Sequence, residues 1–200
     1  MNRWNERYAG EDFLFGTAPN AFLRAQQHRL PARGSALAVA DGEGRNGVWL
    51  AAQGLDVLAV DASDVGLAKS RRLAADRGVT LTWELADLAR WDFGRERFDV
   101  IAAIFIQFAD PALRSRIFAG MKAALKPGGV LLLQGYRPEQ LEYRTGGPSE
   151  PDHLYTEPML REAFGDLHIE HLASYDAELD EGAGHRGMSA LVDLVARKPG

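Results

Sequence analysis

Short apolar runs alternate with helical stretches along most of this chain, and this alternation restricts the fold more than any single motif does. Apolar runs at 36–40, 55–60 and 98–106 are followed by segments of helical character at 46–52, 63–77 and 110–125. A strand that leads into a helix and then into the next strand is the repeating unit of a parallel sheet covered on both faces. The sequence therefore predicts a doubly wound α/β fold.

Local signals define the limits of these elements. Ser63 and Asp110 are suited to cap helices, and Pro111 fits a first helical turn. The run Lys126-Pro127-Gly128-Gly129 ends a helix and leads into a strand at 130–133.

The remainder of the chain adds a strand, a loop, a helix and a strand pair. They are expected as a strand at 79–84, a loop at 136–156, a helix near 158–164, and strands at 167–175 and 189–196 separated by 176–187. Loops of this length are often functional, so 136–156 is expected to be a substrate loop. We expect one domain over residues 1–200, with 1–30 as N-terminal helices or a lid.

Composition and charge exclude several classes of function. Cysteine is absent, which excludes a disulfide framework, a zinc ribbon and a thiol nucleophile. With 28 acidic and 23 basic residues, the net charge of −5 disfavours a nucleic-acid partner. The longest apolar stretch, 100–106, is too short to cross a membrane. The first dozen residues carry charges where a signal peptide needs an apolar run, so a cytoplasmic location is expected.

Partners follow from the same reasoning. His168 and His171 are three apart on a predicted strand and point to opposite faces, so no metal site is expected. We expect a small-molecule substrate, no nucleic acid, no membrane, and a monomer or homodimer.

A glycine-rich segment at 40–47 lies between the first strand and the first helix, where such sheets bind cofactors. Its spacing matches a dinucleotide fingerprint, and Asp61 follows at the expected distance, so a nicotinamide cofactor is one reading. Asp41 and Glu43 would repel a pyrophosphate but attract the cationic groups of S-adenosylmethionine. The local chemistry therefore favours S-adenosylmethionine.

A set of ordered motifs extends over most of the chain. They are Asp41-Gly42-Glu43-Gly44-Arg45-Asn46, Ala59-Val60-Asp61, Ala86-Asp87-Leu88, Phe98-Asp99-Val100-Ile101 and Leu125-Lys126-Pro127-Gly128-Gly129. In this order they resemble class I S-adenosylmethionine-dependent methyltransferases. The runs Trp4 to Tyr8 and Gly16 to Asn20 are similar to the small tellurite-resistance methyltransferases. The resemblance implies a seven-stranded, mostly parallel, Rossmann-like sheet whose last strand is antiparallel.

Ala38 and Ala40 depart from the family, which usually has an acid and a glycine at these positions. Asp41 is the expected replacement for the missing acid. The expected cofactor-binding residues are Asp41, Gly42, Glu43, Gly44, Asn46, Asp61, Ala62, Ser63, Ala86, Asp87, Leu88 and Ile104. The alternative to cofactor binding for Asp87 is to cap a turn.

The expected catalytic pair is His185 with Arg186, because the resemblance to the tellurite-resistance enzymes implies a His and an Arg acting on the substrate there. A solvated hairpin turn is the alternative interpretation. The expected substrate-binding residues are Tyr8, Phe15, Tyr136, Arg137 and Tyr143.

Methyl transfer to an activated carbon needs alignment and exclusion of water more than a dedicated base. A soft or anionic acceptor, such as a thiol or a chalcogen oxyanion, is therefore expected. The alternatives are a nicotinamide-dependent oxidoreductase and a domain that binds S-adenosylmethionine without catalysis.

Overall fold

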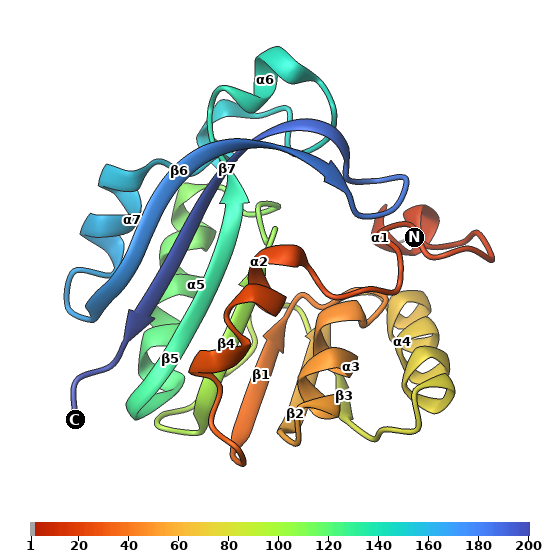
Figure 1. Cartoon of the computed structure of the whole chain (residues 1–200), viewed down its shortest axis with the longest axis horizontal. Coiled ribbons are helices and arrows are strands. Elements are labelled where there is room, and N and C mark those ends of the chain that lie inside the picture. The colour runs from red at the N-terminus through yellow and green to blue at the C-terminus, as the bar shows by residue number, and fades with distance from the viewer. Residues whose placement is uncertain (1–2) are drawn as a thin grey trace.

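The computed structural model describes residues 3–200, which form a seven-stranded sheet in the order β3-β2-β1-β4-β5-β7-β6 (Figure 1). The strands are β1 (Ser35–Val39), β2 (Asp56–Asp61), β3 (Thr82–Leu85), β4 (Phe98–Ile104), β5 (Leu125–Tyr136), β6 (His168–Asp180) and β7 (Arg186–Arg197). Strands β1 to β5 pair in parallel, whereas β7 pairs antiparallel with both β5 and β6. The predicted doubly wound sheet with an antiparallel strand near the C-terminus is confirmed.

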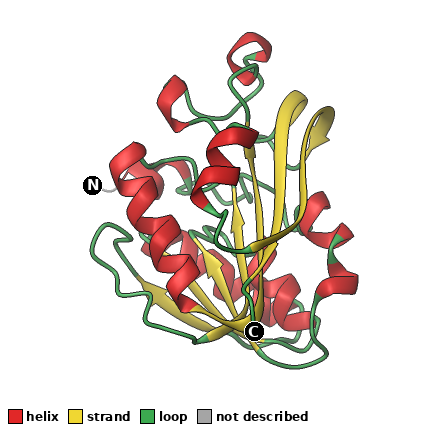
Figure 2. Cartoon of the chain, turned by 90° about the vertical axis from the view of Figure 1, so that its left-hand side faces the viewer, coloured by secondary structure: helices red, strands yellow, loops and turns green. Residues whose placement is uncertain are grey.

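Helices cover both faces of the sheet (Figure 2). They are α1 (Arg3–Arg7), α2 (Ala21–Ala25), η1 (Gln27–Arg29), α3 (Arg45–Ala52), α4 (Asp64–Asp76), α5 (Pro111–Ala124), α6 (Gln140–Tyr143), η2 (Pro151–His153) and α7 (Glu157–Ala163). Ser63 and Asp110 cap α4 and α5 as predicted, each accepting a backbone N–H three residues later.

Alternation along the strands builds a core on each face. On β1, Leu37 and Val39 pack with α5 and α7 residues, whereas Ala36 and Ala38 pack with residues of α2 and α3. Successive side chains of a strand point to opposite faces, so a strand buried on both sides is apolar throughout. The continuous apolar run of β4 has the same cause.

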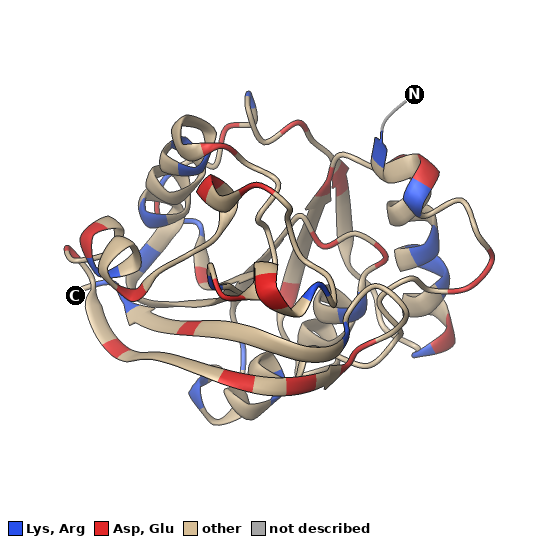
Figure 3. Cartoon of the chain, turned by 90° about the horizontal axis from the view of Figure 1, so that it is seen from above, with Lys and Arg blue, Asp and Glu red and all other residues tan. Residues whose placement is uncertain are grey.

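The β6–β7 hairpin is longer than the sequence predicts. Pairing continues to Asp180 opposite Arg186, so only residues 181–185 turn, in place of the predicted separation at 176–187. The prediction failed because β6 is an edge strand that carries acidic residues, and its polar residues were interpreted as a loop; acidic positions are red on the ribbon in Figure 3. Charges on an edge strand discourage pairing with other chains.

Strand β5 also begins earlier than predicted. Leu125 already pairs with Phe98, and the register shifts before Val130 pairs with Val100. The Lys-Pro-Gly-Gly run is accommodated at this irregularity. The predicted loop at 136–156 contains α6 and η2.

The N-terminal segment crosses the carboxyl ends of the parallel strands and meets the tip of the β6–β7 hairpin (Figure 1). The Gly184 N–H donates to the Leu14 carbonyl at 3.0 Å. Within residues 3–200, no helix is long and apolar enough to span a membrane.

Candidate functional site

The glycine loop between β1 and α3 contains two glycines in the left-handed conformation. Gly42 has a φ of 56° and Gly44, the residue before α3, has a φ of 92°. A side chain at Gly44 would overlap Ser70 of α4, and a Cβ at Gly42 would lie 2.5 Å from the Tyr8 hydroxyl oxygen. The loop is thus packed from two sides, and both positions require glycine.

Asp61 ends β2 beside this loop and is buried. One carboxylate oxygen accepts the Gly42 N–H and the other accepts the Ser63 N–H, both at 2.8 Å. Burial raises the pKa of Asp61, and these hydrogen bonds act in the opposite direction. Each carboxylate oxygen has a further lone pair. Asp61 can therefore accept hydroxyl donors while it still holds the loop.

Asp41 lies at the N-terminal end of α3. Its carboxylate accepts the Gly47 N–H at 3.1 Å. Burial raises the pKa of Asp41 to about 7, because the Gly47 hydrogen bond offsets the loss of water only in part. The preceding Ala40 has a φ of 49°, which a glycine would adopt without strain.

Glu43 fastens the N-terminal segment to the loop and to α4. One carboxylate oxygen pairs with Lys69 Nζ at 2.7 Å, and the other accepts the Leu14 N–H at 2.8 Å. Lys69 also donates to the Asp12 carbonyl at 2.6 Å. The sequence predicts Glu43 as a cofactor residue, but within the chain its charge is already compensated by Lys69.

Other predicted loop residues contact the N-terminal segment. Asn46 Oδ1 accepts the Asn20 N–H at 2.9 Å, and the Ser63 hydroxyl donates to Asn5 Oδ1 at 2.6 Å. Ala62 is exposed beside Ser63. The described part of the predicted lid, residues 3–30, therefore covers the glycine loop, while residues 1 and 2 lie outside the described residues.

The remaining expected cofactor-binding residues, on β4 and after β3, are exposed to different extents. Asp87 is exposed and accepts the Ala89 N–H at 3.0 Å, the turn cap considered as its alternative role. Ala86, Leu88 and Ile104 are buried, and Leu88 packs in the core on the α5 side. Of these four residues, Asp87 alone is exposed to solvent.

Three aromatic rings surround the imidazole of His185. The ring centroids lie 4.4 Å from Phe15, 4.3 Å from Phe105 and 5.8 Å from Tyr136. Phe15 belongs to the N-terminal segment, whereas Phe105 follows β4 and Tyr136 ends β5. We call these four residues the aromatic cage. The cage lies at the carboxyl ends of the strands, the edge where open α/β sheets bind ligands.

Two features mark the cage as more than ordinary packing. Burial and, to a smaller extent, the charges of Arg45 and Arg7 together lower the pKa of His185 to about 3, so the imidazole is neutral at pH 7. Phe105 has a φ of 55°, which is uncommon for an aromatic residue. Backbone strain of this kind clusters at functional sites.

The structure separates the predicted His185 and Arg186 pair. Arg186 has a side chain 70% exposed, and its Nε pairs with Asp180 Oδ1 at 3.1 Å. Consecutive residues on extended backbone point to opposite sides. His185 therefore faces the aromatic cage, and Arg186 faces solvent.

The same alternation divides the predicted substrate residues. Tyr136 lies in the cage, but Arg137 pairs with Asp176 outside it. Tyr143 donates its hydroxyl to the same Asp176 at 3.0 Å. Tyr8 is buried over Gly42, on the cofactor side.

A buried junction joins three elements, and sequence analysis assigned it no role. Arg45 Nη2 pairs with Glu181 Oε2 at 2.8 Å, and Glu181 also accepts the Asn20 side-chain N–H at 3.2 Å and the Ala21 backbone N–H at 2.8 Å. Arg45 begins α3, Glu181 begins the β6–β7 turn, and Asn20 caps α2. The Arg45-Asn46 pair in the glycine motif was the available signal for this junction, but the sequence did not indicate that Glu181 is the partner of Arg45.

The junction continues into the sheet. Asn20 Nδ2 donates to Gln134 Oε1 at 2.7 Å, and Gln134 Nε2 donates to Asp193 at 2.7 Å. The Tyr175 hydroxyl donates to the other Asp193 oxygen at 2.8 Å. Burial raises the pKa of Asp193 to about 6. The glycine loop is thereby connected by hydrogen bonds to β5, β7 and β6.

Residues 36–129, which hold the glycine loop, Asp61 and the end of β4, match the family model of a methyltransferase domain. Over these residues the chain resembles the class I methyltransferases. S-adenosylmethionine is the methyl donor of this class, which confirms the cofactor predicted from the loop. No curated protein sequence matches the chain.

Solved structures share the methyltransferase fold at low identity. A protein described in work on the conversion of a disulfide bond into a thioacetal group during echinomycin biosynthesis has a TM-score of 0.77 and 18% identity, over 98% of this chain and 88% of the other. TehB from Haemophilus influenzae has a TM-score of 0.73 and 19% identity, over 98% of this chain and 65% of the other. The N-methyltransferase NodS from Bradyrhizobium japonicum WM9, in complex with S-adenosyl-l-homocysteine, has a TM-score of 0.73 and 15% identity, over 98% of this chain and 97% of the other.

The site residues fit S-adenosylmethionine by their chemistry. Asp61 keeps lone pairs for ribose hydroxyls, and Gly42 brings bare backbone to the loop surface. The Asp41 carboxyl suits a cationic group, which would favour its ionised form.

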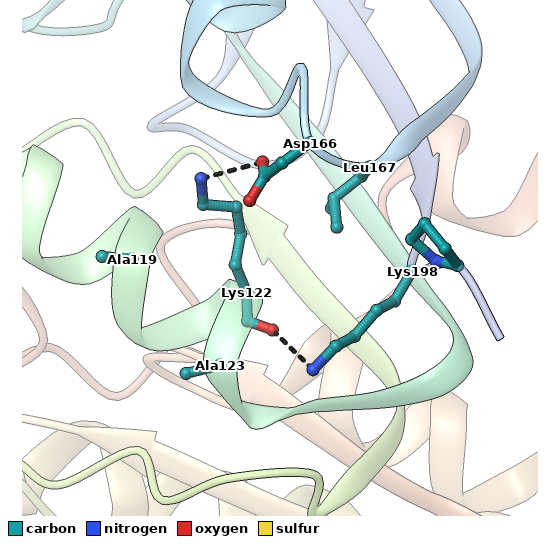
Figure 4. Close-up of a pocket in the computed structure, with 7 residues that line it drawn as sticks. Ala119, Lys122, Ala123, Asp166, Leu167 and Lys198 are labelled. Carbon is teal, nitrogen blue, oxygen red and sulfur yellow. Dashed lines mark hydrogen bonds and ion pairs between the residues drawn. The ribbon is translucent and has the colours of Figure 1, made fainter.

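Two hollows lie at the opposite edge of the sheet. A cavity of about 420 Å³ is bordered by Lys122, Asp166 and Lys198 (Figure 4). Lys122 pairs with Asp166 at 2.9 Å, and Lys198 donates to the Leu125 carbonyl at 2.7 Å, so both ammonium groups have partners within the chain. A hollow of about 230 Å³ beside Pro127 lies at the same amino end of the parallel strands. Ligands of such sheets bind at the carboxyl ends.

Proposed function

We propose that this methyltransferase methylates a small molecule whose nucleophilic atom is a thiolate or a chalcogen oxyanion. The observation that carries the proposal is the uncharged His185 within the aromatic cage. Phe15, Phe105 and Tyr136 would surround the acceptor, and Tyr8 would cover the cofactor side.

The cage favours acceptors that need no base. An imidazole with a pKa near 3 takes up protons poorly at pH 7, so His185 is unsuited to remove a proton from a hydroxyl or an ammonium group. Soft anions are nucleophilic without such help. When bound, S-adenosylmethionine supplies a methyl group on a cationic sulfur. Aromatic faces attract cations, so the cage can favour that charge while it excludes water.

Two observations outside the cage support the same acceptor class. The sequence resembles the tellurite-resistance methyltransferases, and one structural relative is named for the conversion of a disulfide bond into a thioacetal. Both concern sulfur or a heavier element of its group. NodS, in contrast, is an N-methyltransferase, so an amine acceptor is the competing possibility.

Cofactor binding is tested first, by thermal unfolding with S-adenosylmethionine, S-adenosylhomocysteine and NADH. A ligand at about one hundred times its dissociation constant adds roughly 2.7 kcal/mol, which raises the melting temperature by about 5 to 10 °C. The two sulfur nucleosides should produce this shift and NADH should not. Asp61→Ala should remove the shift.

The acceptor is tested with an aromatic thiol, selenite, tellurite, a primary amine and an alcohol, by mass spectrometry of methylated products. We expect products from the thiol or the chalcogen oxyanions, at rates that rise with the thiolate fraction. Methylation of the amine or the alcohol alone would refute the acceptor class. Cofactor binding without turnover on any of these probes would favour the non-catalytic binding domain.

A further inference from the structure

The side chain of Gln107 takes the place of a strand beside the end of β5. The backbone of β5 bonds to the β4 side as far as Gln134, whose carbonyl accepts the Phe105 N–H at 2.8 Å. At Tyr136 the backbone bonds to Gln107 instead: the Tyr136 N–H donates to Oε1 at 2.6 Å, and Nε2 donates to the Tyr136 carbonyl at 2.9 Å. A primary amide carries a donor and an acceptor, as a peptide group does. Gln107 therefore continues the hydrogen-bond ladder beyond the end of β4.

Phe105 turns the chain away from β5 just before Gln107. Its φ of 55° follows directly after Ile104, the last residue of β4, and its ring stacks on that of Tyr136 with centroids 4.6 Å apart. Gln107 is 5% exposed and brings the chain back to the Tyr136 backbone. Strained backbone persists only where its surroundings hold it in place. The hydrogen bonds between Gln107 and Tyr136 provide such a hold.

Gln107 also holds the long loop that follows β5. Its Nε2 donates to the His153 carbonyl at 3.0 Å, and the Tyr155 N–H donates to the Tyr136 carbonyl at 2.9 Å. Packing here is close, since a Cβ at Gly135 would lie 2.9 Å from Gln107 Oε1 and 2.6 Å from Tyr155 Cδ2. One buried amide thus connects the strained turn, a wall of the aromatic cage and the loop predicted to bind substrate.

We propose that Gln107 is a positioning residue of the acceptor site, which fixes Phe105 and Tyr136 as two stacked walls of the aromatic cage. The inference rests on the proposed function of the cage. The three hydrogen bonds of Gln107 go to main-chain atoms, so it acts through the side chains that it positions. Misplacement of reacting groups by about 1 Å can slow a reaction about a hundredfold. Loss of the amide should therefore affect acceptor turnover and spare cofactor binding.

The test compares Gln107→Met, which keeps the length of the side chain without its amide, with Lys122→Met. Lys122 also donates to a main-chain carbonyl, that of Ala163 at 2.8 Å, but at the opposite edge of the sheet. Steady-state kinetics with an aromatic thiol give kcat and KM, and calorimetry gives the affinity for S-adenosylhomocysteine. In Gln107→Met alone, kcat/KM for the thiol should fall at least about tenfold, while the affinity for S-adenosylhomocysteine changes by less than about twofold.

Gln107→Glu adds a pH-dependent measurement and serves if Gln107→Met fails to fold. The ionised carboxylate can accept the Tyr136 N–H but repels the carbonyls of Tyr136 and His153, whereas its protonated form can donate to one of them. Burial raises the pKa of a carboxyl. The thiol rate, relative to that of the unmodified chain at the same pH, should therefore rise as the pH falls from about 8 to about 6.

Hydrogen exchange measured by mass spectrometry reports on the same contact without turnover. Gln107→Met should speed exchange in peptides that cover 105–109 and 136–155 and leave those of α3 and α4 unchanged. The inference is overturned if Gln107→Met lowers kcat/KM no more than Lys122→Met does, if it weakens S-adenosylhomocysteine binding equally, or if exchange rises evenly along the chain. If the unmodified chain binds S-adenosylhomocysteine but methylates no thiol or oxyanion probe, the proposed function is refuted instead, and the exchange pattern decides the role of Gln107.

Discussion

The Glu43 and Lys69 pair makes the attachment of the N-terminal segment open to direct measurement. Glu43→Gln removes the negative charge beside the buried Lys69 ammonium, which keeps its hydrogen bond to the Asp12 carbonyl and its place 5.7 Å from the centroid of the Phe13 ring. Breaking a buried ion pair by removing one partner costs about 3 to 5 kcal/mol. Because Lys69 keeps one hydrogen bond, the lower end of about 3 kcal/mol is expected. For a domain of this size that corresponds to a fall in melting temperature of about 6 to 12 °C.

The assay is urea unfolding followed by tryptophan fluorescence, together with scanning calorimetry at pH 7. Asp180→Asn is the control, since it breaks an ion pair whose side chains are 70% and 80% exposed. Such surface pairs contribute under about 1 kcal/mol. The double variant Glu43→Gln with Lys69→Met removes the unpaired charge and should recover part of the lost stability. The reasoning is refuted if Glu43→Gln destabilises the chain no more than Asp180→Asn does.

Three further outcomes are expected. Gly44→Ala should lower the free energy of unfolding by about 3 kcal/mol, because residue 44 has a left-handed φ and a Cβ there would overlap Ser70. Gly78→Ala, at a φ of 66° with open space around it, should lower the free energy of unfolding by about 1 kcal/mol; urea unfolding measures both. Affinity for S-adenosylmethionine should rise between pH 6 and 8 as Asp41, whose pKa is about 7, ionises; calorimetry that finds the same slope in Asp41→Asn would contradict this. Because the pKa of Asp193 is raised to about 6, this carboxyl stays protonated in the native state between about pH 4 and 6, where it is ionised in the unfolded chain. The free energy of unfolding should therefore fall by about 3 kcal/mol as the pH rises through that window, and Asp193→Asn should flatten this part of the stability curve.

Local patterns were sufficient to predict much of the fold. The caps of α4 and α5, the apolar strands buried on both faces and the glycine loop all depend on neighbours within a few residues. The β6–β7 hairpin was mispredicted because an edge strand exposes one face, and its polar residues do not differ from those of a loop.

The candidate site was predicted less completely, for a physical reason. Asp61 and His185 occupy recognisable positions in the chain, at a strand end and a glycine-flanked turn. The partners of Glu43 and Arg45 come from segments 26 and 136 residues away, Lys69 and Glu181. Nothing in the residue spacing indicates which acid pairs with which base, so these contacts emerge only from the tertiary structure.

The position of β7 between β5 and β6 also has a consequence for biosynthesis. A ribosome releases β6 before β7, although β6 can join the sheet only through β7. Until β7 emerges, the nascent chain therefore exposes the unpaired edge of β5, and unpaired strand edges are prone to aggregation. Glu181 and His185 lie in the turn that precedes β7, so the chain acquires its aromatic cage only at the end of this assembly.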